Sequence, residues 1–221
     1  MAEISKNFIS LVALGGLNPQ ILNVDFLKVN KIVPTSEPPF DKLFQQQKPF
    51  TKFISTPIVS ELLLENIHFI VEEGRFQIRD VAVSEWDKTK VLAIAIKYFE
   101  VLPYTPLKTV GLNLNATITF ETNQEAQKFQ QIFLPEKSKV IGIISKENIV
   151  ADLVLHYSYS DNGERISLSL SQQNNTKIKR ILNFNYEFDF IDWTHFGAEL
   201  NKISQISKYF DSILEQLLKG I

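Results

Sequence analysis

The proline residues of this 221-residue chain lie only in its first part, and this distribution is the strongest constraint on the fold. All nine fall between residues 19 and 135, and residues 136–221 contain none. Proline lacks a backbone N–H and breaks both helices and interior strands. The first part is therefore expected to form short elements, whereas the proline-free remainder can hold long strands and a long helix.

Alternating apolar and polar residues predict an antiparallel meander in the proline-free region. Strands are predicted at residues 140–145, 149–159, 166–172 and 177–190. The turns between them, such as Asp161–Asn162–Gly163, are too short for parallel crossovers. A helix over 194–219 follows, with apolar residues at helical spacing and Gly220 at the C-cap position. Its apolar face is expected to pack on the sheet or on a partner.

The first part of the chain predicts shorter elements of both kinds. Asn18–Pro19 is typical of a helix start, and Glu73–Gly74 is typical of a hairpin turn. The pattern of residues 40–53 favours neither helix nor strand. Strands are predicted at 7–14, 58–65, 67–72, 75–83 and 107–120, with helices at 19–29, 87–102 and from 122 or 123 to about 133.

The elements together predict the fold class α+β, with a curved, mainly antiparallel sheet and the long C-terminal helix packed on it. No linker divides the chain, so residues 1–221 are expected to form a single domain. A strand–helix–strand order recurs loosely in both halves. Seventeen phenylalanines indicate a core rich in phenylalanine.

Composition excludes several classes of function. The chain has no cysteine, which excludes disulfides, thiolate metal sites and cysteine nucleophiles. Its net charge is −2, without the basic excess typical of nucleic-acid binders, so neither nucleic acid nor membrane is an expected partner. The first residues lack the basic segment of a signal peptide, and no apolar window reaches the roughly 18 residues of a membrane span. The expected location is cytoplasmic.

Four short stretches carry a family resemblance. They are Gly16–Ile21, Thr56–Ser60, Arg75–Ile78 and Thr105–Leu107, the last leading to Gly111–Asn113. In this order and spacing the chain resembles a family of uncharacterised bacterial proteins of similar length. The resemblance implies a bacterial origin but no activity. It also motivates one hypothesis, that the chain is a subunit of a bacterial defence or toxin–antitoxin system.

The search for catalytic chemistry is negative. The three histidines, His68, His156 and His195, stand alone, without the spacing of a zinc site. Nucleophile-elbow and phosphate-loop motifs are absent from the sequence. No catalytic residue, metal ligand or cofactor is therefore predicted. Glu187 and Asp189 share one strand face and would be the first carboxylates to test in an enzyme.

The candidate binding residues are polar side chains on predicted strands. Asn113 and Asn115 belong to a ladder of amides and hydroxyls that faces water or a polar ligand. His68 would favour a ligand site if it lay in a pocket beside a carboxylate. Arg75 opens one of the stretches that carry the resemblance. A serine-rich face on the meander offers weakly charged strands that can pair with another chain.

The leading hypothesis is a non-enzymatic binding or assembly protein that forms a homo-oligomer, with a second copy or another protein as its partner. The alternative is an enzyme or small-ligand protein with a pocket between the sheet and the C-terminal helix. An interior filled by phenylalanine would count against that pocket.

Overall fold

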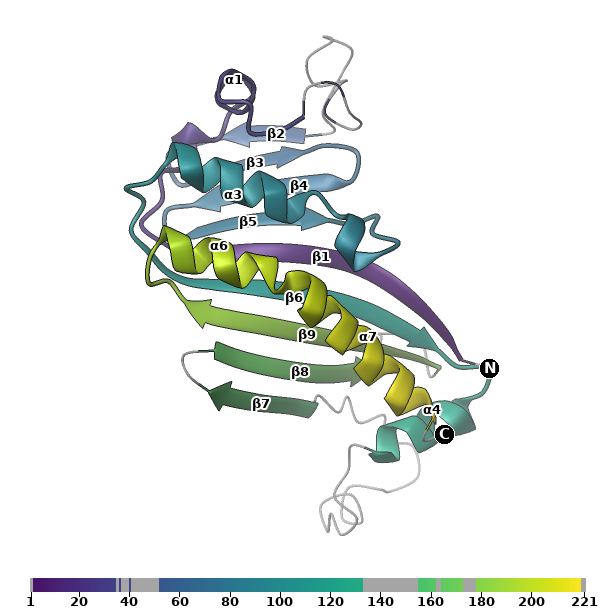
Figure 1. The fold of residues 1–221 in the computed structure, drawn as a ribbon. Helices are drawn as coiled ribbons and strands as arrows, with labels where there is room; N and C mark the ends of the chain where they lie inside the picture. The colour runs from purple at the N-terminus through teal and green to yellow at the C-terminus, as the bar shows by residue number, and fades with distance from the viewer. Residues whose placement is uncertain are drawn as a thin grey trace.

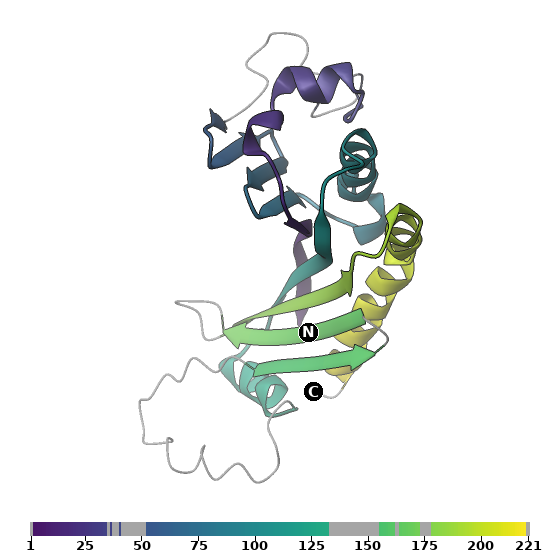
Figure 2. The same cartoon turned by 90° about the vertical axis from the view of Figure 1, so that its left-hand side faces the viewer.

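A computed structural model shows two layers, an antiparallel sheet and a layer of helices over one of its faces (Figures 1 and 2). The structure describes residues 2–34, 36, 40, 52–132, 155–161, 164–172 and 178–219. This arrangement confirms the α+β class and the curved antiparallel sheet that the sequence predicts. The predicted strand at 140–145 and the start of that at 149–159 lie outside the described residues.

In the part of the chain that the structure describes, the sheet has nine strands in the order β2-β3-β4-β5-β1-β6-β9-β8-β7. All neighbouring strands are antiparallel. The strands are β1 (Glu3–Gly15), β2 (Lys52–Ser55), β3 (Val59–Leu63), β4 (Ile67–Glu72), β5 (Arg75–Asp80), β6 (Leu107–Thr119), β7 (Leu155–Asp161), β8 (Glu164–Gln172) and β9 (Lys179–Asp189).

The helices include three long segments, α3, α6 and α7, that lie side by side or end to end over the same face of the sheet (Figures 1 and 2). None of the described helices is both long and apolar enough to cross a membrane. The helical segments are η1 (Pro19–Ile21), α1 (Val24–Val29), η2 (Trp86–Lys88), α3 (Val91–Val101), α4 (Asn123–Ile132), α6 (Trp193–Asn201) and α7 (Ile203–Lys219).

The two halves of the chain repeat one plan. In the first, β1 is followed by α1, the meander β3-β4-β5 and the helix α3. In the second, β6 is followed by α4, the meander β7-β8-β9 and the helices α6 and α7. Each meander runs back so that its last strand pairs with the first strand of its half. The halves join where β1 pairs with β6, and β2 is added at the outer edge of the first half.

Three predicted helices are each divided in two. The helix predicted at 87–102 forms η2 and α3, with Thr89 and Lys90 between them. The helix predicted at 19–29 ends at Ile21 and restarts at Val24, because the Asn23 side chain accepts a hydrogen bond from the Phe26 backbone N–H at 2.8 Å and caps a new helix. The predicted helix start at Asn18–Pro19 is confirmed. The C-terminal helix is interrupted at Lys202. The short strand β2 begins at Lys52, within residues 40–53, for which no element is predicted, and ends at Ser55.

Aromatic side chains fill the space between the sheet and the helices. Phe184 on β9 stacks on Phe210 of α7 with ring centroids 5.3 Å apart, and Phe99 of α3 contacts Phe196 of α6 edge to face at 6.0 Å. These rings are buried. Burying such a face removes a large apolar area from water. The predicted phenylalanine-rich core and the packing of the C-terminal helix on the sheet are therefore confirmed.

Asp211 on α7 links the C-terminal helix to the first half of the chain. One carboxylate oxygen accepts a hydrogen bond from the Trp86 indole N–H at 3.0 Å, and the other pairs with the Lys6 ammonium at 3.1 Å. That ammonium also lies 5.0 Å from the centre of the Trp86 ring. One carboxylate thus holds α7, η2 and β1 together.

We expect Gly15→Ala to destabilise the protein by about 1–3 kcal/mol through overpacking. A Cβ at this position would lie 2.4 Å from the Pro106 carbonyl oxygen and 2.9 Å from the Leu107 Cα, and both are backbone atoms that cannot move alone. Urea unfolding followed by tryptophan fluorescence measures the change. The matched control is Gly74→Ala, because a Cβ there meets nothing within 4 Å. Equal stability of the two variants would contradict the expectation.

Candidate functional site

The face of the sheet opposite the helices is lined with polar side chains. None of the described helices covers it (Figure 2), and we call it the helix-free face. One cross-strand row on it runs through six strands, from β4 to β8, in continuous register. Its members are His68, Arg79, Ser10, Asn113, Asn185 and Ser167.

All four sequence-predicted binding residues lie on this face, but they do not form one site. His68 and Asn113 share the row, yet three strand spacings, roughly 14 Å, separate them. His68 Nε2 lies 2.8 Å from a Glu61 carboxylate oxygen, on a neighbouring strand rather than in a pocket. Arg75 donates to the Gln77 side chain at 2.6 Å, near the end of the strands. Whether any of the four binds a ligand stays a prediction.

Asn113 and Asn115 of β6 form, with Asn183 and Asn185 of β9, a two-by-two set of amides that we call the asparagine block. On β9, Asn185 lies opposite Asn113 and Asn183 lies opposite Asn115. On the other side Asn7, at a bulge in β1, donates to the Asn115 side-chain oxygen at 2.6 Å and to the Thr117 hydroxyl at 2.8 Å. These bonds order the amides before any ligand arrives. The alternation along the predicted strand 177–190 places Asn183 and Asn185 on the face that does not carry the aromatic residues. Their partners on β6 depend on strand register, which the alternation does not give.

Charged groups flank the asparagine block on both sides. On the β5 side, the Arg79 guanidinium lies 4.4 Å from the centre of the Phe8 ring, and its Nε has no hydrogen-bond partner among the described residues. Burial, together with the nearby charge of Arg75, lowers the pKa of Arg79. On the β9 side, Arg165 bonds to Glu187 at 2.6 Å and to Asp189 at 2.8 Å. The two carboxylates that an enzyme hypothesis would test first are thus held by one arginine.

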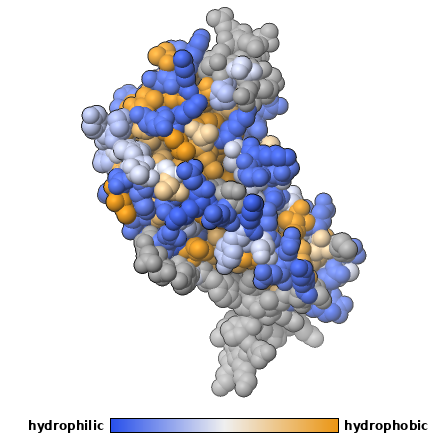
Figure 3. Space-filling model, viewed as in Figure 1, coloured by the Kyte–Doolittle hydropathy of each residue, from blue (hydrophilic) through white to orange (hydrophobic). Residues whose placement is uncertain are grey.

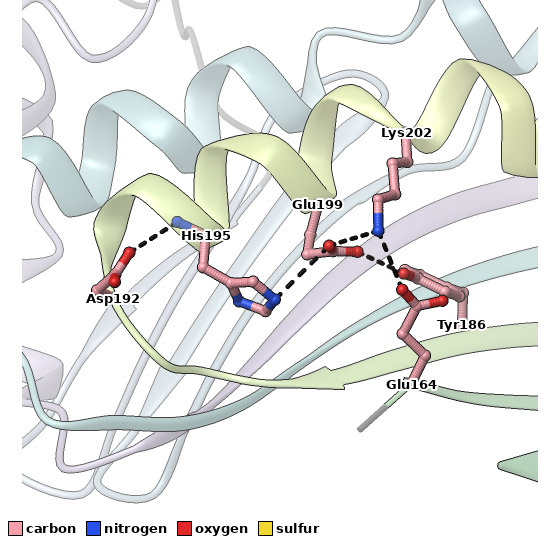
Figure 4. A network of polar contacts seen from close by, with 6 residues as sticks. All are labelled: Glu164, Tyr186, Asp192, His195, Glu199 and Lys202. Carbon is pink, nitrogen blue, oxygen red and sulfur yellow. Dashed lines mark hydrogen bonds and ion pairs between the residues drawn. The ribbon is translucent and has the colours of Figure 1, made fainter. Parts of the chain in front are cut away.

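A charge cluster centred on a buried glutamate lies on the other face, between α6 and the sheet (Figure 4). Glu199 on α6 is only 4% exposed. One of its oxygens accepts a hydrogen bond from the Tyr186 hydroxyl at 2.5 Å, and the other lies 2.6 Å from the Lys202 ammonium. Lys202 also reaches Glu164 of β8 at 3.0 Å, and His195 Nε2 lies 3.6 Å from Glu199. The cluster links α6 to both β8 and β9.

The surroundings set the charge states in this cluster. Burial alone raises the pKa of Glu199, but the hydrogen bonds from Lys202 and Tyr186 and the charges of Lys202 and His195 outweigh it, so its pKa lies below the ordinary value. Hydrogen bonds to Glu199 and Glu164 raise the pKa of Lys202. Burial and the bond to Glu199 raise the pKa of Tyr186. The cluster is therefore an ionised carboxylate with a protonated lysine and a neutral tyrosine.

This arrangement anchors α6 to the sheet. Each oxygen of Glu199 is bonded to a group of the protein, one to Tyr186 and the other to Lys202. Glu199 lies in the last turn of α6. The start of α6 is capped by the Asp192 side chain, which accepts a hydrogen bond from the His195 backbone N–H at 2.7 Å. Sequence analysis considers His195 but misses Glu199 and Tyr186. Their partnership depends on where α6 lies over β9.

A pocket of about 310 Å³ opens at the end of α3. It lies between the segment 16–21 and the loop 102–106, away from the interface between the sheet and the C-terminal helix. That interface, where the alternative hypothesis expects a pocket, is packed with aromatic rings among the described residues. The stretches Gly16–Ile21 and Thr105–Leu107, which share in the resemblance, meet at the observed pocket.

We expect Glu199→Gln to make stability less dependent on pH in the acid range. A carboxyl whose pKa is lower in the folded than in the unfolded chain stabilises the fold above the unfolded value, and this contribution is lost as the pH falls through the folded value. The free energy of unfolding of the variant should be about 1–3 kcal/mol lower near pH 7. It should also fall less steeply as the pH decreases, so the acid limb of its stability curve is shallower. Urea unfolding at several pH values between about 3 and 7 measures both effects.

The matched control is Glu215→Gln on α7, where the side chain is exposed. This change should leave both the stability at neutral pH and the acid limb as they are in the wild type. An acid limb of Glu199→Gln as steep as that of the control would show that Glu199 does not stabilise the fold in its ionised form.

No known protein-family model matches the chain, and no curated protein is significantly similar to it in sequence. The resemblance to the bacterial family therefore rests on its quoted stretches, and the defence or toxin–antitoxin hypothesis stays a prediction.

Proposed function

We propose that this protein is a non-enzymatic binding or assembly protein that forms a homo-oligomer through the helix-free face of its sheet. The observation that carries the proposal is the asparagine block, a two-by-two set of amides on β6 and β9 with charged groups on either side. We place this assembly in the cytoplasm, as the sequence predicts.

The chemistry of the block makes the face complementary to itself. Each asparagine amide carries both donors and acceptors, and the Ser167 hydroxyl does the same. Asn113, Asn183, Asn185 and Ser167 are partly exposed, whereas Ser10, Asn115 and Thr117 are buried and support the patch from below. A two-fold axis presents the same patch from both subunits, so a patch must be able to bond its own copy. A patch of one charge would repel itself, whereas amides and hydroxyls pair with any register.

The block is also ordered in advance, which lowers the entropy lost on association. Asn7 bonds to Asn115 and Thr117, and Arg75 bonds to Gln77, all within one subunit. Side chains that are already fixed lose less rotamer freedom at an interface. Two sheets can then pack face to face at the usual separation of about 10 Å.

Charges add a preferred orientation. In one row of the face, Leu14 and Thr109 lie between Arg75 on β5 and Asp189 on β9. Glu72 on β4 continues the row beyond Arg75 and lies 3.6 Å from its guanidinium. A two-fold axis along the seam of β1 and β6 would place β5 of one subunit over β9 of the other. Arg75 would then face the acidic residues on β9 of the second copy, and Arg79 would approach the same residues. Complementary charge of this kind favours one orientation over others.

Light scattering coupled to size-exclusion chromatography, over about 1–100 µM protein, tests the assembly. We expect the wild type to elute with a mass that is a multiple of the monomer mass. Asn113→Lys puts like charges near the axis and should weaken association at least about tenfold. The matched control is Asn201→Lys, at an exposed position on α6, which should leave the mass unchanged. A wild type that is monomeric over the whole range would overturn the proposal.

Charge reversal tests the orientation and separates it from misfolding. Arg75→Glu and Asp189→Lys should each weaken the assembly, and the double variant should restore part of it, because the opposite charges then meet again across the axis. Circular dichroism of each variant checks that the monomer stays folded. Additive losses in the double variant would contradict this arrangement of the two subunits.

A further inference from the structure

We propose that the pocket at the end of α3 binds a small uncharged molecule with an aromatic ring and a hydrogen-bonding group. This site lies apart from the asparagine block, so the inference does not depend on the proposed assembly. Its volume, about 310 Å³, is at the lower end of the range for small-ligand sites. Apolar residues gather over this end of the molecule, around α1 and α3 (Figure 3).

The walls of the pocket are fixed by bonds within the chain. The Gly16 N–H donates to the Pro106 carbonyl at 3.2 Å, which joins the two segments that line it. The Thr105 N–H donates to the Leu102 carbonyl at 3.0 Å, and the Trp193 indole N–H donates to the Pro103 carbonyl at 2.9 Å. Prolines at 103 and 106 restrict the backbone further. The pocket is therefore formed before a ligand enters, which favours affinity.

The lining residues exclude charged ligands. None of them is an aspartate, glutamate, lysine, arginine or histidine. A charged group placed there would lose its hydration without gaining an ion-pair partner from the walls. The apolar walls come from Leu17, Ile21, Val101, Leu102 and the two prolines, and the polar groups come from Asn18, Thr105 and two tyrosines. This combination suits a neutral, amphipathic ring.

The two tyrosines have different roles in such a site. Tyr98 is buried against Phe26 and Phe76, with ring centroids at 5.7 Å and 4.6 Å, so its ring is a fixed wall. Burial raises the pKa of Tyr98, which keeps its hydroxyl a neutral donor. Tyr104 also lines the pocket but is 96% exposed. It adds nothing to the core, and it can cover an aromatic ring bound beside it.

Asn18 supplies a side-chain amide that the fold uses only in part. The Asn18 side-chain oxygen accepts a hydrogen bond from the Gln20 N–H at 3.0 Å and so caps η1. This bond fixes the amide plane and leaves its NH₂ group to donate to a ligand. A phenol or a similar ring alcohol could accept that bond while its ring packs against Val101 and Ile21.

Titration of ¹⁵N-labelled protein with three matched phenols tests the site by NMR. The probes are p-cresol, which is neutral, 4-hydroxybenzoate, which is an anion, and tyramine, which is a cation. We expect p-cresol to shift the signals of Gly16, Thr105 and the Asn18 side-chain amide in a saturable way. It should bind at least about tenfold more tightly than either charged probe, because the walls offer no counter-charge. Equal binding of the three probes, or no shift with p-cresol, would overturn the inference.

Val101→Trp fills the pocket and should abolish the p-cresol shifts. The matched control is Val29→Trp on α1, where the side chain is 76% exposed and outside the pocket, and this variant should bind as the wild type does. A dispersed spectrum shows that each variant is folded. If Val101→Trp does not fold, Asn18→Asp serves instead, since it keeps a side-chain oxygen that can cap η1 and removes the NH₂ donor, and it should weaken p-cresol binding. Undiminished binding in the folded pocket variant would place the ligand elsewhere and refute the proposal.

Discussion

The pairing of β1 with β6 is the interaction on which the rest of the structure depends. These two long strands stay in register from Glu3 opposite Thr119 to Leu14 opposite Thr109, with a bulge near Asn7. Every other strand attaches to one of them or to a strand already attached, so the seam divides the sheet into its two halves. Helix α7 crosses to the other half above it, where Asp211 contacts Trp86 and Lys6. The same seam joins the two sides of the polar face into one continuous curved surface.

The two faces of the sheet have separate tasks because their side chains differ in kind. On one face, aromatic rings hold α3, α6 and α7, and the buried Glu199 adds a directional bond to Tyr186 where apolar packing alone would let the helix slide. On the other face, amides and hydroxyls bond sideways to each other, as Asn7 does to Asn115. A sheet with one dry and one polar face stays stable while leaving the polar face available for binding.

Local sequence patterns predict most of the helices and strands, whereas the candidate sites depend on tertiary contacts. Strand β4 has the predicted bounds, Ile67–Glu72, because its alternation ends at the Glu73–Gly74 turn. Strand β2 escaped prediction since it is an edge strand exposed along its length and has no buried alternation. The Asn113 ladder could be found on its own strand, but its partners on β9 depend on register. Likewise, no local pattern joins Tyr186 to Glu199.

The seam also has a consequence for how the chain folds as it is made. Strand β1 is synthesised before both of its neighbours, since β5 is complete only at Asp80 and β6 only at Thr119. Pairing over such a distance in sequence is slow, because closing the long loop between the strands costs entropy before the paired strands contribute any favourable contacts. The apolar residues of β1, among them Ile9 and Leu11, stay unpaired in the meantime. Strand β1 is thus exposed to aggregation until β6, its partner at the seam, has been synthesised.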